Sequence, residues 1–81
     1  MAYRFGDFVL EPRRHRLRRG NEEFPLRPKT FETLLYLVEH PDRVVTKEDL
    51  LQNVWADAYV VEAVIAQSIS ELRAVLGENV H

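Results

Sequence analysis

The charged side chains are divided unevenly along the chain, and the basic ones gather near its beginning. Residues 1–30 hold eight Arg and Lys against four Asp and Glu, whereas residues 31–81 hold three against nine. The densest basic segment is Arg13-Arg14-His15-Arg16-Leu17-Arg18-Arg19. Such an asymmetry is informative about partners rather than about fold. The segment is interpreted either as a nucleic-acid patch or as a solvated strand edge.

The groups that catalysis or metal binding requires are not assembled in the sequence. There is no cysteine, which excludes disulfides and thiolate metal sites. His15, His40 and His81 are scattered and lack the spacing of metal ligands. No nucleophile–base pair, Gly-rich phosphate loop or paired carboxylates stand out. We therefore expect no enzyme, no cofactor, no metal site and no small-molecule substrate.

The composition is that of one small globular domain, residues 1–81. The apolar fraction is 46% and the charged fraction 30%, which is ordinary for a soluble domain. No stretch approaches the roughly 20 apolar residues of a membrane span, and residues 1–7 contain no apolar run of signal-peptide length. We expect a cytoplasmic location, no direct membrane contact, and a domain that stands first in its parent protein.

The first third of the chain predicts a small antiparallel sheet, residues 1–26. Residues 3–10 are rich in β-formers, with a turn or bulge at Gly6-Asp7, and Pro12 ends this stretch. Residues 14–19 and 22–26 flank Gly20-Asn21, a dipeptide suited to positive φ, and predict a hairpin. The side chains expected to point inward are Leu17, Phe24 and Leu26.

Residues 28–77 predict three helices. The first begins at Pro28, where a missing N–H costs nothing, and ends at Pro41. The second begins after Thr46, which can cap it in a capping-box arrangement with Asp49. The third covers about residues 60–76 and stops at Gly77. The apolar stripes of the first two helices are Phe31, Leu34, Leu35 and Val38, and Leu50, Leu51, Val54 and Trp55.

Two helices joined by a short turn form a helix-turn-helix pattern, which alone is a weak signal. Several segments nevertheless occur together in a characteristic order and spacing. They are Tyr3-Arg4-Phe5-Gly6-Asp7, Leu26-Arg27-Pro28-Lys29-Thr30-Phe31-Glu32-Thr33-Leu34-Leu35, Val44-Val45-Thr46-Lys47-Glu48-Asp49-Leu50-Leu51, Val54-Trp55 and Ile69-Ser70-Glu71-Leu72-Arg73-Ala74-Val75-Leu76-Gly77. Together they resemble the effector domain of OmpR/PhoB-type response regulators, the output domains of two-component signalling.

This resemblance implies an α+β winged helix-turn-helix fold with a four-stranded N-terminal sheet, three helices and a C-terminal hairpin wing. The third helix is expected in the major groove and the wing at the minor groove. Double-stranded DNA is the implied partner, bound by homodimers at repeated half-sites, and RNA polymerase is a further candidate partner. An N-terminal position without a receiver resembles the subset of the family in which the domain heads a longer chain.

The chain departs from the family pattern at its end, because it stops at Glu78-Asn79-Val80-His81 where the family continues into the wing. We expect a domain truncated before its wing, with apolar surface left exposed or covered by a partner. Trp55 is expected in the core. The basic segment is expected to be a solvated edge of the sheet, because the resembled fold places it away from the recognition helix.

The third helix presents an outer face with few charges. Its core face is expected to hold Val61, Ile65, Ile69, Leu72 and Leu76, and the opposite face Ala63, Gln67, Ser70 and Ala74, flanked by Ala66 and Glu71. Gln67 can bond an adenine edge, and Glu71 can accept from cytosine unless it is simply solvated. Ser70 can reach a base or a phosphate, and Arg73 resembles the family's phosphate contact.

The beginnings of the other two helices are candidates for phosphate contact. Thr46 and Lys47 open the second helix and Lys29 and Thr30 open the first, where free backbone N–H groups favour anions. Thr46 is also a plain cap.

Two functions follow from these observations. The first is the DNA-binding domain of a bacterial transcriptional regulator. The alternative is a protein–protein interaction or dimerisation module on the same scaffold, which the net charge of −6 over residues 31–81 favours. DNA affinity comes largely from Lys and Arg, so we expect a non-specific Kd no better than ~10⁻⁴ M at physiological salt.

Overall fold

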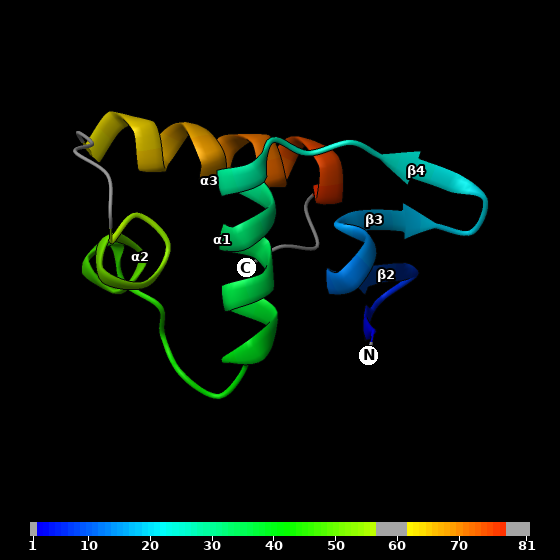
Figure 1. Cartoon of the computed structure of the whole chain (residues 1–81), viewed down its shortest axis with the longest axis horizontal. Helices are drawn as coiled ribbons and strands as arrows, with labels where there is room; N and C mark the ends of the chain where they lie inside the picture. Colours follow the sequence, from blue (N-terminus) through cyan, green and yellow to red (C-terminus); the bar gives the residue numbers. More distant parts are fainter. Residues whose placement is uncertain (1, 57–61, 78–81) are drawn as a thin grey trace.

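A computed structural model describes residues 2–56 and 62–77 of the chain. A four-stranded antiparallel sheet with the strand order β1-β2-β3-β4 comes first, and three helices follow it (Figure 1). The elements are β1 (Tyr3–Phe5), β2 (Phe8–Glu11), the 3-10 helix η1 (Pro12–Arg14), β3 (Arg16–Arg19), β4 (Glu22–Phe24), α1 (Pro28–Glu39), α2 (Lys47–Asn53) and α3 (Glu62–Leu76). The predicted α+β fold is confirmed.

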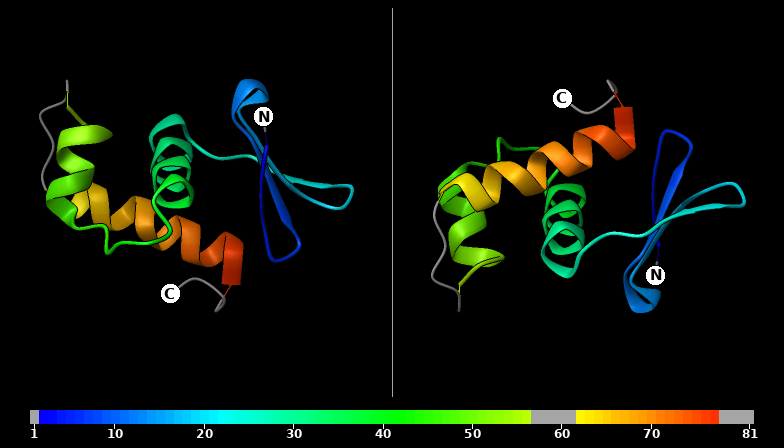
Figure 2. Two further views of the ribbon diagram at one scale, coloured as in Figure 1. Left: turned by 90° about the horizontal axis from the view of Figure 1, so that it is seen from below. Right: turned by 90° about the horizontal axis from the view of Figure 1, so that it is seen from above.

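Helix α1 lies between the sheet and α2, and α3 extends across α2, α1 and the sheet (Figures 1 and 2). Both views of Figure 2 show the sheet and α2 on opposite sides of α1. Helix α3 therefore has one end near α2 and the other near the sheet, and its position depends on packing at both ends.

The sheet turns where the sequence indicated. Gly6 (φ 56°) lies between β1 and β2, and Gly20 (φ 60°) lies between β3 and β4, a conformation that glycine adopts without steric cost. Strand β3 is shorter than predicted, because residues 12–14 form η1 and His15 adopts φ 53°. Leu10 pairs with Leu17, and Leu17 with Phe24, so one row of side chains faces the helices.

The core consists of two clusters that α3 joins. The first packs the sheet against α1 and the end of α3 through Phe8, Leu10, Leu17, Phe31, Leu34, Leu72 and Leu76. The second packs α2 and the chain after it against the beginning of α3 through Leu50, Val54, Trp55 and Ile65. Trp55 is buried as predicted. Leu51 was expected in the apolar stripe of α2 but is 38% exposed. In this seven-residue helix Leu50 faces the core, whereas Leu51 lies on the side that faces solvent.

The expectation that the basic segment forms a sheet edge is wrong. Strand β3 pairs with β2 on one side and with β4 on the other, so the edges of the sheet are β1 and β4. The arginines of β3 are accommodated on an interior strand because alternate side chains, Arg16 and Arg18, lie on the face away from Leu17. Glu11 and Glu23 on the neighbouring strands pair with them there.

The capping box at the start of α2 is present as predicted. The Asp49 backbone N–H donates to the Thr46 hydroxyl (3.1 Å), and the Thr46 N–H donates to the Asp49 carboxylate (2.9 Å). These hydrogen bonds, with the Thr46 backbone first among the causes, lower the pKa of Asp49 below its ordinary 3.8. No helix within residues 2–56 and 62–77 is long and apolar enough to cross a membrane.

The capping box predicts an acid-sensitive contribution to stability. Because the pKa of Asp49 is lowered by folding, its contribution is present above the ordinary value and is lost as the pH falls through the lowered one. We expect Asp49→Asn to lower the free energy of unfolding at about pH 6, and the difference from the wild type to shrink at about pH 2. Urea titrations at the two pH values measure this. A difference that stays constant with pH would contradict it.

Candidate nucleic-acid interface

One side of α3 is open to solvent over its whole described length. Ile65, Leu72 and Leu76 are buried on the opposite side, as the periodicity predicted, and Ile69 is partly buried. The exposed residues of the predicted outer face are Ala63, Ala66, Gln67, Ser70, Arg73 and Ala74. Val61, assigned to the core face, lies outside the described residues. The outer face is therefore available as a continuous contact surface.

A polar network fastens the middle of α3 to the beginning of α1. The Thr30 hydroxyl donates to the Glu71 carboxylate (2.8 Å) and lies 3.3 Å from the hydroxyl of Ser68. Arg27, the residue before α1, also donates to both oxygens of Glu71. Thr30 is 0% exposed and Ser68 2%, so the two hydroxyls satisfy each other's hydrogen-bonding needs inside the core. The network sets how α3 is presented.

This network changes the roles expected of two residues. Thr30 is fully buried, backbone included, so neither its hydroxyl nor its backbone N–H is open to a phosphate in this structure. Glu71 is half-buried and accepts three hydrogen bonds, so it is neither a free surface charge nor directed at a base edge. A contact from Glu71 to cytosine would require these bonds to break.

The lysines at the helix beginnings also have partners within the chain. Lys29 donates to the backbone carbonyl of Val54 (2.6 Å) and lies 3.5 Å from Glu32. Lys47 pairs with Glu62 at the start of α3, and this pair lowers the pKa of Glu62. Both lysines therefore join helices in addition to any role toward a ligand. Arg73 is exposed and forms no ion pair within the described part of the chain.

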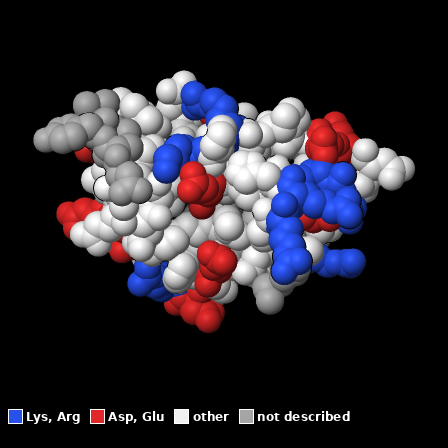
Figure 3. Space-filling model, in the orientation of Figure 1, with Lys and Arg blue, Asp and Glu red and all other residues white. Residues whose placement is uncertain are grey.

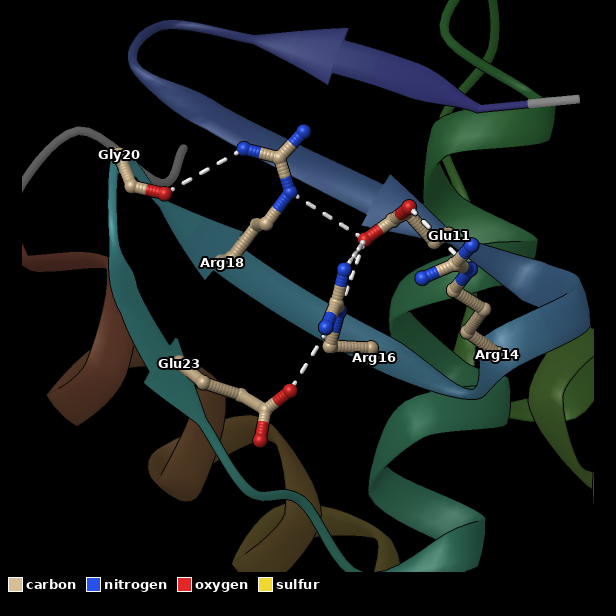
Figure 4. A network of polar contacts seen from close by, with 6 residues as sticks. All are labelled: Glu11, Arg14, Arg16, Arg18, Gly20 and Glu23. Atoms are coloured by element: carbon tan, nitrogen blue, oxygen red, sulfur yellow. Dashed lines mark hydrogen bonds and ion pairs between the residues drawn. The ribbon is translucent and has the colours of Figure 1, made fainter.

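The basic side chains of η1 and β3 gather over the sheet (Figure 3). Arg43, in the connection between α1 and α2, lies elsewhere and contacts Tyr36 and Asp49. Glu11 lies at the centre of the group over the sheet and accepts from Arg16 (2.9 Å) and Arg18 (3.2 Å), with Arg14 at 4.0 Å (Figure 4). The hydrogen bond from Arg16 is the main reason why the pKa of Glu11 is lowered. Much of this charge is neutralised locally, which is typical of a structural face rather than of a phosphate-binding one.

The role of Ser68 and the interhelical partners of Glu71 and Lys29 were not predicted from the sequence. One signal was available for Ser68, because it lies three residues after Ile65 and four before Leu72, on the core face of α3. A small polar residue at such a position predicts a buried hydrogen bond. Its partner could not be identified, since that depends on how α1 and α3 cross.

Known proteins match both the sequence and the fold. The family described as "Transcriptional regulatory protein, C terminal" matches residues 21–81. The transcriptional activator CadC of Escherichia coli is 32% identical over 76 residues, 94% of this chain and 15% of that protein. The phosphate regulon regulator PhoB of the same species is 34% identical over 73 residues, 89% of this chain and 32% of that protein. The chain thus spans a third or less of the length of these relatives.

Two solved structures extend the likeness to the three-dimensional arrangement. The DNA-binding domain of E. coli CadC superposes with a TM-score of 0.83 at 31% identity, over 96% of this chain and 73% of that one. The DNA-binding domain of Klebsiella pneumoniae RstA, solved in complex with the RstA box, gives 0.80 at 25% identity, over 96% and 78%.

Proposed function

The chain belongs to the family of transcriptional regulatory protein C-terminal domains, and we propose that α3 is the helix through which it reads DNA. It is an OmpR/PhoB-type DNA-binding domain of a bacterial transcriptional regulator, and its partner is double-stranded DNA. The observation that carries the proposal is the open outer face of α3, whose exposed residues include an amide, a hydroxyl and one arginine. A helix of this kind fits the major groove.

Each exposed residue has a proposed role. Gln67 bonds a base edge, Ser70 bonds a base or a phosphate, and Arg73 contacts the backbone, while Ala66 lies against the bases. The backbone N–H groups of Lys29 and Lys47, in the first turns of α1 and α2, hold phosphates on either side. Thr30 and Thr46 take no part, because Thr30 is buried and the Thr46 N–H donates to Asp49. Homodimers on DNA, contact with RNA polymerase and a cytoplasmic location are further proposals that rest on the family alone.

Arg73 provides the sharpest test of whether the outer face of α3 lies against DNA. We expect Arg73→Gln to weaken binding to all duplexes alike and to reduce the slope of log K against log salt by about 0.9, the value for one phosphate contact. Fluorescence anisotropy at four salt concentrations measures the slope. Arg4→Gln is the matched control, because Arg4 is exposed on β1 and has no ion pair among the described residues. Equal slopes for the two variants would exclude Arg73 from the interface.

One observation favours the alternative function, a protein–protein module: the Arg and Lys side chains around α3 form ion pairs within the chain. Arg27 and Lys47 are tied to Glu71 and Glu62, so few charges are available for phosphates. The two functions differ in one measurement. A chain that binds no duplex at low salt, yet self-associates in sedimentation, is an interaction module, and the proposal above would then be wrong.

A further inference from the structure

We infer that α3 selects A·T base pairs by contacting thymine methyl groups with its alanines, so that the preferred sites are rich in thymine. This inference rests on the proposed function and names the class of DNA sequence that the same face takes. It follows from two observations: the fold exposes alanines on the outer face of α3, and it holds most of the nearby Arg and Lys side chains in contacts within the chain.

The outer face of α3 presents several methyl groups and, with Arg73 at its border, few charges. Ala63, Ala66 and Ala74 are exposed along it: Ala63 lies one turn before Gln67, Ala66 is next to it and Ala74 lies two turns after it. In the major groove, apolar side chains pair with the C5-methyl group of thymine, and glutamine bonds the N6 and N7 positions of adenine. Both kinds of contact identify the same base pair. The alanines and the amide of Gln67 therefore both favour an A·T base pair.

The same face lacks what guanine recognition needs. Arg or Lys on guanine O6 and N7 is the commonest specific contact to DNA. Among the described residues of α3, Arg73 is the only Arg or Lys, and it lies at the border of the face near the last turn. Alanines cannot replace such a donor, because they offer no hydrogen bond.

The neighbouring elements cannot supply the missing charge without a loss elsewhere. Arg27 is held by Glu71 and Lys47 by Glu62, while Lys29 donates to the Val54 carbonyl. Reaching a guanine would break contacts that join α1 and α2 to their surroundings. Short side chains at the centre of α3 also allow its backbone to approach the base edges closely, which brings the alanine methyls within reach of thymine methyls.

The test removes only the methyl groups of the DNA. A duplex is first selected from a random library at low salt, and each thymine is then replaced by uracil, which pairs identically but lacks the methyl. We expect selected sites dominated by A·T pairs, and a loss of about fourfold in affinity for each contacted methyl. The effect should be confined to the few positions under α3.

Variants assign the effect to α3. Ala66→Ser should reduce the penalty of uracil at one position, because the hydroxyl replaces an apolar contact, whereas Ala2→Ser, exposed at the far end of the sheet, should leave every penalty unchanged. Tight binding to guanine-rich sites with no uracil penalty would overturn the inference and leave the proposed function standing. Failure to bind any duplex at low salt would overturn both.

Discussion

Replacing Leu72 with alanine is expected to lower the free energy of unfolding by about 2–5 kcal/mol. Leu72 is 1% exposed and lies where the sheet, α1 and α3 meet in the first core cluster. Truncation there removes the transfer free energy of the side chain and leaves a cavity that three elements cannot easily close. A domain of this size has about 5–15 kcal/mol in total, so the loss is a large fraction of it.

Thermal unfolding followed by circular dichroism measures the effect, with an expected fall in Tm of roughly 10–30 °C. Val64→Ala is the control on the same helix, since Val64 is 38% exposed and its truncation should cost less than about 0.5 kcal/mol. If the two variants lost equal stability, Leu72 would not anchor α3. The same experiment bears on function, because a helix that is not anchored cannot present Gln67 and its neighbours at a fixed depth.

The features that could be predicted from the sequence are those that depend on local spacing. The apolar period in α1 and α3, the pairing of Thr46 with Asp49, and the turns at Gly6 and Gly20 each involve residues within a few positions of one another. Local geometry decides such features, so a pattern is enough to find them. The outer face of α3 was predicted in this way, as the side opposite Ile65 and Leu72.

The features that could not be predicted depend on how distant elements meet. The position of β3 inside the sheet follows from strand pairing, and the basic composition of its residues gave no indication of it. The burial of Thr30 follows from the crossing of α1 and α3, which brings Ser68 and Glu71 to it from about 40 residues away. Spacing places Thr30 in the first turn of α1 but does not say what lies over that turn.

The second large effect is expected at this crossing. Thr30→Val keeps the shape of the side chain and removes only its hydroxyl. The buried hydroxyl of Ser68 then has no partner, and Oε2 of Glu71 keeps only its hydrogen bond from Arg27. A buried polar group deprived of its hydrogen bond costs about 1–3 kcal/mol. We expect a loss of this size in urea unfolding, and faster amide exchange around the middle of α3.

Thr33→Val provides a close control, because Thr33 is also 0% exposed but its hydroxyl donates only to the Lys29 carbonyl within the same helix (2.7 Å). We expect this variant to lose clearly less stability and to leave exchange in α3 unchanged. A double variant, Thr30→Val with Ser68→Ala, should recover part of the loss, since it removes the orphaned hydroxyl as well. If Thr30→Val and Thr33→Val lost the same stability and the double variant recovered nothing, the network would not hold α3.

The network also constrains how this domain can acquire affinity for DNA. Glu71 repels phosphates, yet it is the acceptor that holds both Thr30 and Arg27. We therefore expect Glu71→Gln to lower the free energy of unfolding, because the network weakens, and to strengthen DNA binding, because Arg27 becomes free to reach the DNA backbone. A variant that binds duplexes more tightly with a steeper salt slope, while unfolding at lower urea, would show that the fold keeps this arginine from DNA in order to position α3.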